Sequence, residues 1–257
     1  MMLVTLKEHC RSLVEILKDP MLISEWESTV EWLRLAASIK CIEVDMIEHE
    51  LFGFCKGGDK YDIAHEDLMN RFVMDLSIFN FVWAALESCL NQISPPKHPD
   101  KSKRGKINNA CHYLSQYFAM KPLLPLLHDE INAFRLASSL CLGYKSVEKR
   151  FHQSEGAGFG LFTVYELRNL FAHGSSNFPR LDENNEPIIN HHCMMCHATR
   201  IVLIYIQMLL LAYFDYSSLK VVYSWHKEVY LEEEILWIAL SYCHLTTQST
   251  EIQISLF

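Results

Sequence analysis

Residues 64–93 read AHEDLMNRFVMDLSIFNFVWAALESCLNQI. The large apolar side chains in this run recur every three or four residues, a period that gathers them on one face of an α-helix. They are Leu68, Phe72, Leu76, Phe79, Val82, Trp83, Leu86 and Leu90. Ser94-Pro95-Pro96 follows directly. Because proline is poorly tolerated inside a helix, the sequence predicts one long amphipathic helix that ends near residue 93.

Helical periodicity continues outward from this run in both directions. On the N-terminal side, helices are predicted over about residues 6–18 and 24–51. Between them and the long run, Gly57-Gly58-Asp59 predicts a turn. On the C-terminal side, helices are predicted over about residues 107–119, 126–142, 161–173 and 190–216.

The C-terminal part has a mixed pattern. Residues 221–223 and 252–256 are candidate strands, whereas residues 228–242 have a helical pattern. The polar loop over residues 94–106 is the best boundary within the chain, but we do not expect it to separate domains. The sequence therefore predicts an all-α fold, a helical bundle, in a single domain over residues 1–257.

The composition narrows the function classes. Half of the 257 residues are hydrophobic and 21% are charged, which excludes an intrinsically disordered chain. The net charge is −8 and the isoelectric point is near 5.9, so bulk charge does not draw this protein to nucleic acid. Any RNA contact is therefore expected to come from a local basic patch.

The cysteines and the N-terminal residues favour a cytoplasmic protein. The nine cysteines are odd in number and mostly scattered, which favours reduced thiols over a disulfide framework. The first eight residues have neither a basic segment nor a long apolar one, so no signal peptide is expected. The most apolar run, residues 201–214, is interrupted by Gln207 and is too short to span a bilayer. We expect a buried helix there and no membrane contact.

Residues 165–174 read YELRNLFAHG and carry the strongest functional signal. Arg168 is followed by the polar Asn169, and His173 lies five positions after Arg168 at the end of an expected helix. This pattern resembles the Arg-x4–6-His signature of the HEPN superfamily, whose core is a helical bundle. Many HEPN proteins are metal-independent ribonucleases of toxin–antitoxin systems, antiviral systems and RNA processing, and others are inert binding modules.

The resemblance to HEPN proteins covers roughly residues 64–215 and includes the helix that contains Trp83-Ala84-Ala85-Leu86-Glu87. It therefore implies a HEPN-like core with additional helices on both sides. The N-terminal extension would comprise residues 1–60, and the C-terminal extension would comprise residues 217–257.

The chemistry of the motif side chains suits RNA cleavage. Attack of a 2′-hydroxyl on the phosphate needs a proton acceptor, a proton donor for the leaving oxygen, and a cation beside the pentavalent phosphate. The ordinary pKa of histidine lies nearest neutral pH, so His173 is the expected general acid or base. Arg168 offers a planar fork to phosphate oxygens. Asn169 lies four residues before His173 and is expected to position it.

Arg168 and His173 point about 140° apart on an ideal helix, so one chain does not readily direct both at one phosphate. Following the HEPN resemblance, we expect a homodimer in which two motifs pair at the interface. Glu87, on a neighbouring helix, is a supporting candidate that would hold Arg168 in place. The alternative is that Arg168 merely pairs with an acid such as Glu87 and that His173 merely caps its helix.

A basic loop follows the long helix. Its cations are Lys97, Lys101, Lys103, Arg104 and Lys106. Asp100 is the only acidic residue among them, so in an acidic protein this loop is the clearest candidate for contact with RNA phosphates. The alternative is a solvated loop without a binding role.

Residues 191–197 read HHCMMCH. The side-chain types suit zinc, and Cys193, Cys196 and His197 share one face of the expected helix, which makes them weak candidates for a metal site. The chain has no second Cys-x2-Cys pair to complete such a site, so no metal or other cofactor is expected. The alternatives are histidines that line an RNA groove and cysteines that pack as small apolar side chains.

The segment Gly156-Ala157-Gly158-Phe159-Gly160 directly precedes the motif helix. Its three glycines favour a flexible connector. A phosphate site at the N-terminus of the helix is the alternative.

The expected function is a metal-independent endoribonuclease that cuts RNA as a toxin or antiphage effector, with an antitoxin or sensor protein as a possible partner. The rival expectation is a non-catalytic module that binds a protein, a nucleotide or RNA without cutting it. A third expectation is a zinc-stabilised regulator built on Cys193, Cys196 and nearby histidines.

Overall fold

The computed structural model describes residues 2–45, 56–141, 156–182, 188–215, 219–223 and 232–246. Helices dominate this part of the chain, so the predicted all-α fold class is confirmed. The helices are α1 (Leu6–Leu17), α2 (Ile23–Ser38), α3 (Lys56–Ile93), the short 3-10 helix η1 (Lys101–Lys103), α4 (Lys106–Tyr117), α5 (Leu127–Leu140), α7 (Phe159–Ala172), α8 (Asn190–Phe214) and α9 (Leu236–Tyr242). The described strands are β1 (Lys220–Tyr223) and β2 (Glu232–Ile235), which pair antiparallel.

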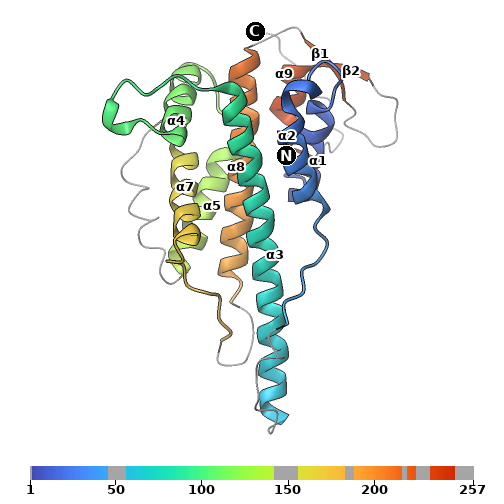
Figure 1. Ribbon diagram of the computed structural model, residues 1–257, viewed down its shortest axis with the longest axis vertical. Coiled ribbons are helices and arrows are strands. Elements are labelled where there is room, and N and C mark those ends of the chain that lie inside the picture. The colour runs from blue at the N-terminus through green and yellow to red at the C-terminus, as the bar shows by residue number, and fades with distance from the viewer. Residues whose placement is uncertain are drawn as a thin grey trace.

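Helix α8 is the centre of the bundle. It contacts α1, α3, α4, α5, α7 and α9, and α3 runs beside it along the long axis of the molecule (Figure 1). Figure 1 shows α1 and α2 on one side of this pair and α4, α5 and α7 on the other. Every residue over 198–212 is buried, because a helix without a polar face is stable only when other elements surround it. The predicted buried helix over residues 201–214 is thus confirmed up to its last turn.

Two described helices, Lys60–Ile93 and Asn190–Phe214, are long and apolar enough to cross a membrane by length and composition alone. In the helix over Asn190–Phe214, 89% of the most apolar window is buried inside the bundle. In the helix over Lys60–Ile93, 44% of that window is buried. Packing within the protein therefore accounts for the apolar sequence of α8.

Local signals place several helix ends. Thr5 and Glu8 form a reciprocal capping box at the start of α1, in which the Thr5 hydroxyl accepts the Glu8 N–H and the Glu8 carboxylate accepts the Thr5 N–H. Ser94 ends α3 with a φ of +48°, just before the first of two prolines. The end of the long helix near residue 93 is therefore as predicted.

Two predictions near the start of the long helix are wrong. Helix α2 ends at Ser38 and residues 39–45 are not helical, whereas the sequence predicts a helix over 24–51, whose last part lies outside the described residues. The Val44 N–H donates to the Asn70 side chain on α3, which gives this segment a partner outside any helix. Residues 57–59, predicted as a turn, belong to the first turn of α3, where glycine costs only about 1 kcal/mol relative to alanine.

The C-terminal elements close one end of the bundle. Strand β1 pairs with residues 232–235, with Lys220 opposite Ile235. The sequence predicts a helix over 228–242, but in the described part only residues 236–242 are helical. Pairing with β1 overrides the helix propensity of the three glutamates in β2. The N-terminal segment joins the same region, since the Val4 N–H donates to the His244 carbonyl at 3.0 Å. The predicted strand over 252–256 lies outside the described residues.

A buried polar chain connects α1, α8 and α9. The guanidinium of Arg200 donates to Nδ1 of His9 at 3.1 Å, so the proton of that ring is on Nε2, which donates to the Gln207 carbonyl at 2.7 Å. The Gln207 amide donates to the Leu240 carbonyl and to Nδ1 of His244. The Nε2 proton of His244 then reaches the Pro125 carbonyl at 3.1 Å. Each of these polar groups has a partner.

Both imidazoles of this buried polar chain are neutral. Burial, with the nearby Arg200 charge, holds the pKa of His9 well below its ordinary value. Burial also lowers the pKa of His244 to about 4. The N-terminal and C-terminal extensions are therefore joined to α8 by neutral hydrogen bonds in the hydrophobic core, and one contiguous cluster of buried residues runs from α1 to α9.

Candidate functional site

Helix α7 carries the Arg168–His173 motif. Its C-terminal end follows the prediction: His173 is the C-cap residue, Gly174 has the left-handed φ of +62°, and the Ser175 N–H donates to the Leu170 carbonyl at 2.8 Å. This is the arrangement in which a glycine after the last helical turn satisfies the free carbonyls. The motif histidine is therefore held at a well-defined helix end.

The glycine-rich start of α7 is a packing site. A Cβ on Gly158 would lie 2.5 Å from Cα of Cys111, so the glycine permits close contact between α7 and α4. The Gly160 N–H donates to the Tyr205 hydroxyl at 3.0 Å, and that hydroxyl donates to the Ala157 carbonyl. Because a buried tyrosine occupies this helix terminus, both expectations for residues 156–160, a flexible connector and a phosphate site, are wrong.

The three motif side chains lie at the far end of α7, and in the described part of the chain no hydrogen bond joins them to one another. Arg168 and Asn169 are half-buried and His173 is exposed. The His173 N–H donates to the Asn169 carbonyl at 3.0 Å, which is an ordinary helical bond. Within the residues that the structure describes, no side-chain hydrogen bond joins Asn169 to His173, and Arg168 has no ion-pair partner. A single chain therefore holds the motif residues on one helix end without assembling them.

Aromatic contacts fix the motif helix against α3. Tyr165 stacks on Trp83, with 6.1 Å between ring centroids, and Phe171 contacts Phe72 at 6.1 Å. Arg168 lies between these two anchors in the sequence. These contacts with α3 hold both ends of the motif segment.

Glu87 has a different partner from the one predicted. Its carboxylate accepts the Trp83 indole N–H at 2.8 Å, one turn away on α3. In the described part of the chain Glu87 forms no ion pair with Arg168, so it orients the tryptophan on which Tyr165 stacks. Its effect on Arg168 is therefore indirect.

The basic loop lies at the other end of α7. All five cations are exposed, and the Asp100 carboxylate caps η1 by accepting the Ser102 N–H. Lys106 donates to the Asn91 side chain at 2.7 Å, and Arg104 donates to the His98 carbonyl at 3.2 Å. Figure 1 shows this loop beside the start of α7, and the 14 residues of α7, about 20 Å long, separate it from His173. The loop and the motif of one chain do not form one site.

The histidine–cysteine run at the start of α8 divides between two neighbouring helices. His197 Nδ1 lies 2.8 Å from a carboxylate oxygen of Glu130 on α5. His192 and Cys196, one turn apart, instead face Asp75 on α3. Cys193 lies near Cys141 at the end of α5, and burial together with this neighbour raises the pKa of Cys141 to about 11. The predicted trio of Cys193, Cys196 and His197 therefore does not assemble.

The residues that do assemble are Asp75, His192 and Cys196, whose candidate ligand atoms all lie within 4.8 Å of one another. His192 Nδ1 lies 2.7 Å from Oδ2 of Asp75, and hydrogen bonds to Asp75 and Cys196 raise the pKa of His192 to about 10. Sequence reasoning missed Asp75 because nothing local distinguishes an aspartate on an amphipathic helix. The other two come from the run over residues 191–197, whose residue types suit zinc, although the sequence predicts Cys193, Cys196 and His197 as the ligands there.

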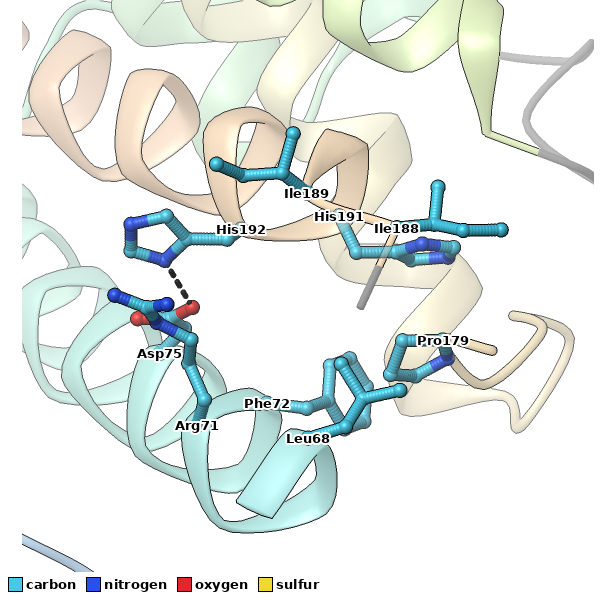
Figure 2. Close-up of a pocket in the computed structure, with 9 residues that line it drawn as sticks. All are labelled: Leu68, Arg71, Phe72, Asp75, Pro179, Ile188, Ile189, His191 and His192. Carbon is cyan, nitrogen blue, oxygen red and sulfur yellow. Dashed lines mark hydrogen bonds and ion pairs between the residues drawn. The ribbon is translucent and has the colours of Figure 1, made fainter. Parts of the chain in front are cut away.

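A small pocket of about 80 Å³ opens beside this cluster (Figure 2). Leu68, Arg71, Phe72 and Asp75 of α3 form one wall. The other residues that line it are Pro179, Ile188, Ile189, His191 and His192. Phe72 also contacts Phe171 and Phe178, so the pocket adjoins the C-terminal end of the motif helix.

Comparison with known proteins finds no family model that matches the chain, no similar curated protein and no similar solved structure. The functional argument therefore rests on the residues and geometry of this chain.

Proposed function

We propose that the protein is a metal-independent endoribonuclease of the HEPN type. The observation that carries this proposal is the state of the two motif side chains. Among the described residues, Arg168 and His173 have no hydrogen-bond or ion-pair partner for their side chains, although the chain contains 31 acidic residues. A guanidinium and an imidazole on a helix end, without partners in the described part of the chain, are available to a substrate.

In the proposed reaction, the 2′-oxygen of a ribose attacks the adjacent phosphorus and the bond from phosphorus to the 5′-oxygen breaks. A base removes the 2′-hydroxyl proton, and an acid supplies a proton to the leaving 5′-oxygen. His173 performs one of these proton transfers, and Arg168 neutralises the non-bridging phosphate oxygens. The products are a 2′,3′-cyclic phosphate and a 5′-hydroxyl.

The proposed active form is a homodimer. Arg168 and His173 diverge by about 140° around α7, so a second motif related by two-fold symmetry would supply the complementary side chain. Asn169, half-buried and one turn before His173, would position the imidazole once RNA is bound. The exposed basic loop would contact RNA phosphates away from the cut site.

The biological setting that we propose is a toxin or antiphage effector in the cytoplasm, with an antitoxin or sensor protein as its regulator. The acidic net charge of −8 supports regulation, because an acidic surface does not retain RNA without a specific contact.

Single substitutions test the site. Loss of a general acid or base reduces rates about 10²–10⁴-fold, so His173→Ala is expected to reduce RNA cleavage by this factor. Arg168→Ala is expected to lower the rate about 10²–10³-fold. The matched controls are His128→Ala and Arg11→Ala, which replace exposed residues on α5 and α1 and should retain the wild-type rate. Wild-type rates in both motif variants would contradict the assignment.

Co-expression of the two inactive variants tests the shared site. If Arg168 of one chain acts with His173 of the other, about half of the dimers are mixed and each has one intact site, so about a quarter of the wild-type rate should return. If each motif acts alone, no activity should return.

The rival function, a non-catalytic binding module, is favoured by one observation: no described side chain orients His173 in the single chain. The two proposals differ in outcome, because a binding module would retain intact RNA in a gel-shift experiment and never produce cyclic phosphate ends.

A further inference from the structure

Three side chains of different metal-binding types meet between α3 and α8. They are a carboxylate, an imidazole and a thiol, and they come from two helices that pack along the core. We propose that Asp75, His192 and Cys196 bind a zinc ion, with the fourth coordination position open to the adjacent pocket. This site is separate from the Arg168–His173 motif, and the proposal does not depend on the ribonuclease proposal.

The ligand atoms lie close enough to bind zinc after small side-chain shifts. With Zn–N near 2.0 Å and Zn–S near 2.3 Å, tetrahedral ligands place nitrogen about 3.5 Å from sulfur. Sγ of Cys196 lies 3.6 Å from Nε2 and 3.7 Å from Nδ1 of His192, which is the right separation. Because the sulfur is nearly equidistant from the two nitrogens, it lies over the ring, and the His192 side chain must turn to direct one nitrogen at an ion shared with the thiol. Oxygen and nitrogen ligands would be about 3.3 Å apart, whereas Asp75 and His192 are 2.7 Å apart, so metal binding needs a shift of about half an ångström.

The helices preorganise the three ligands. His192 and Cys196 are four residues apart on α8 and therefore share a face, and Asp75 faces them from α3. Side chains on packed helices are held more precisely than side chains on loops. An ion could therefore enter without rearrangement of the backbone.

The three side chains are partly buried, but the site is open to solvent on the side of His192. Asp75 is 8% exposed, whereas the His192 side chain is 29% exposed and lines the pocket. A buried carboxylate needs a cationic partner, and the imidazole provides it when no metal is bound. An ion pair alone does not need a thiol as a third member, but zinc does favour one. The pocket leaves room for a water molecule as the fourth ligand.

Arg71 supplies a test of the electrostatics. Arg71 lies one turn before Asp75 on α3 and lines the same pocket (Figure 2), where its positive charge opposes a bound cation. The residue is exposed, so it can turn toward solvent. Arg71→Ala is therefore expected to bind the metal more tightly than wild type.

The experiment uses the full chain, stripped with chelator and reloaded with ZnCl2 or CoCl2. Wild type is expected to retain one zinc ion per chain after gel filtration and to show the near-ultraviolet thiolate-to-cobalt band. Second-sphere changes weaken metal sites about 10–100-fold, so Cys196→Ser, His192→Asn and Asp75→Asn should each weaken zinc binding by more than about 100-fold. The matched control is Cys193→Ser, a thiol on the same helix that lies near Cys141 instead.

Two results would overturn the zinc site. The first is wild-type protein with far less than one zinc per chain and no cobalt–thiolate band, a measurement that does not depend on whether any variant folds. The second is loss of the band in Cys193→Ser with retention in Cys196→Ser. His173→Ala should keep its zinc, so failure of the ribonuclease proposal and failure of the zinc proposal are distinguishable.

Discussion

The two ends of α8 use histidine in opposite ways. Near the N-terminus of α8, His192 and His197 are about 30% exposed and each faces a carboxylate on a neighbouring helix. Near its C-terminus, Gln207 lies between His9 and His244, which burial keeps neutral. Hydrogen bonds to Asp75 and Cys196 raise the pKa of His192 at one end, whereas burial lowers the pKa of His9 and His244 at the other.

The difference separates structure from candidate function. At the C-terminal end of α8, each polar side chain of the buried polar chain has a partner, so no side chain is left for a ligand. At the other end, His192 borders a pocket and a thiol, so a ligand can compete for it. We therefore expect the C-terminal end of α8 to determine stability and the N-terminal end to determine binding.

The largest effect is expected at Gln207. Gln207→Leu leaves His9, His244 and the Leu240 carbonyl without their buried partners, and each unsatisfied group costs about 1–3 kcal/mol. The free energy of unfolding should fall by about 3–6 kcal/mol in urea denaturation. Gln116→Leu, an exposed glutamine on α4, is the control and should change it by less than about 0.5 kcal/mol. Equal effects of the two substitutions would show that the buried polar chain contributes nothing.

The pH dependence of stability should come next in size. The folded-state pKa of His244 is lowered to about 4 from an ordinary value of 6.5. Between these values the unfolded chain takes up a proton that the folded chain excludes, so the free energy of unfolding falls as the pH drops. His244 alone should remove about 2 kcal/mol between pH 6.5 and pH 5, and His9 adds to this loss. Urea titrations across this range would contradict the account if stability stayed constant.

The smallest effect is expected at the N-terminal end of α8. His197→Ala removes a partly exposed partner from the buried Glu130 carboxylate, and loss of one such partner costs about 1–3 kcal/mol. The loss should stay at the lower end of this range because the Arg200 charge still interacts with Glu130. Thermal unfolding of His197→Ala and Gln207→Leu under the same conditions compares the two losses in stability. If His197→Ala destabilised the protein as much as Gln207→Leu, the distinction between the two ends would be lost.

The sequence predicts most of the bundle because helical periodicity is a local property. The end of α3 before Pro95, the end of α7 at Gly174 and the burial of α8 all follow from residues within a few positions. The predictions fail where a residue far away in the sequence determines the local structure. Strand β2 forms because β1 pairs with it. Helix α2 ends earlier than predicted, and in the segment that follows it the Val44 N–H donates to Asn70 on α3.

The candidate sites divide in the same way. Arg168, Asn169 and His173 lie within six residues of sequence, so their placement on one helix end was predictable. The pairing of His192 with Asp75 joins residues 117 positions apart, and the partner of Gln207 on α1 is 198 positions away. In the sequence, Gln207 only interrupts an apolar run. Periodicity shows which face of a helix is buried, but it does not show which polar groups meet inside.

The most direct test of the proposed function is RNA cleavage in excess EDTA. Purified wild-type protein and His173→Ala would each be incubated with a mixed pool of transfer and messenger RNA, and the ends of the fragments would be analysed. The account predicts cleavage by wild type alone, with 2′,3′-cyclic phosphate ends, because His173 acts without a metal. Intact RNA with folded wild-type protein, or equal cleavage by both proteins, would contradict it.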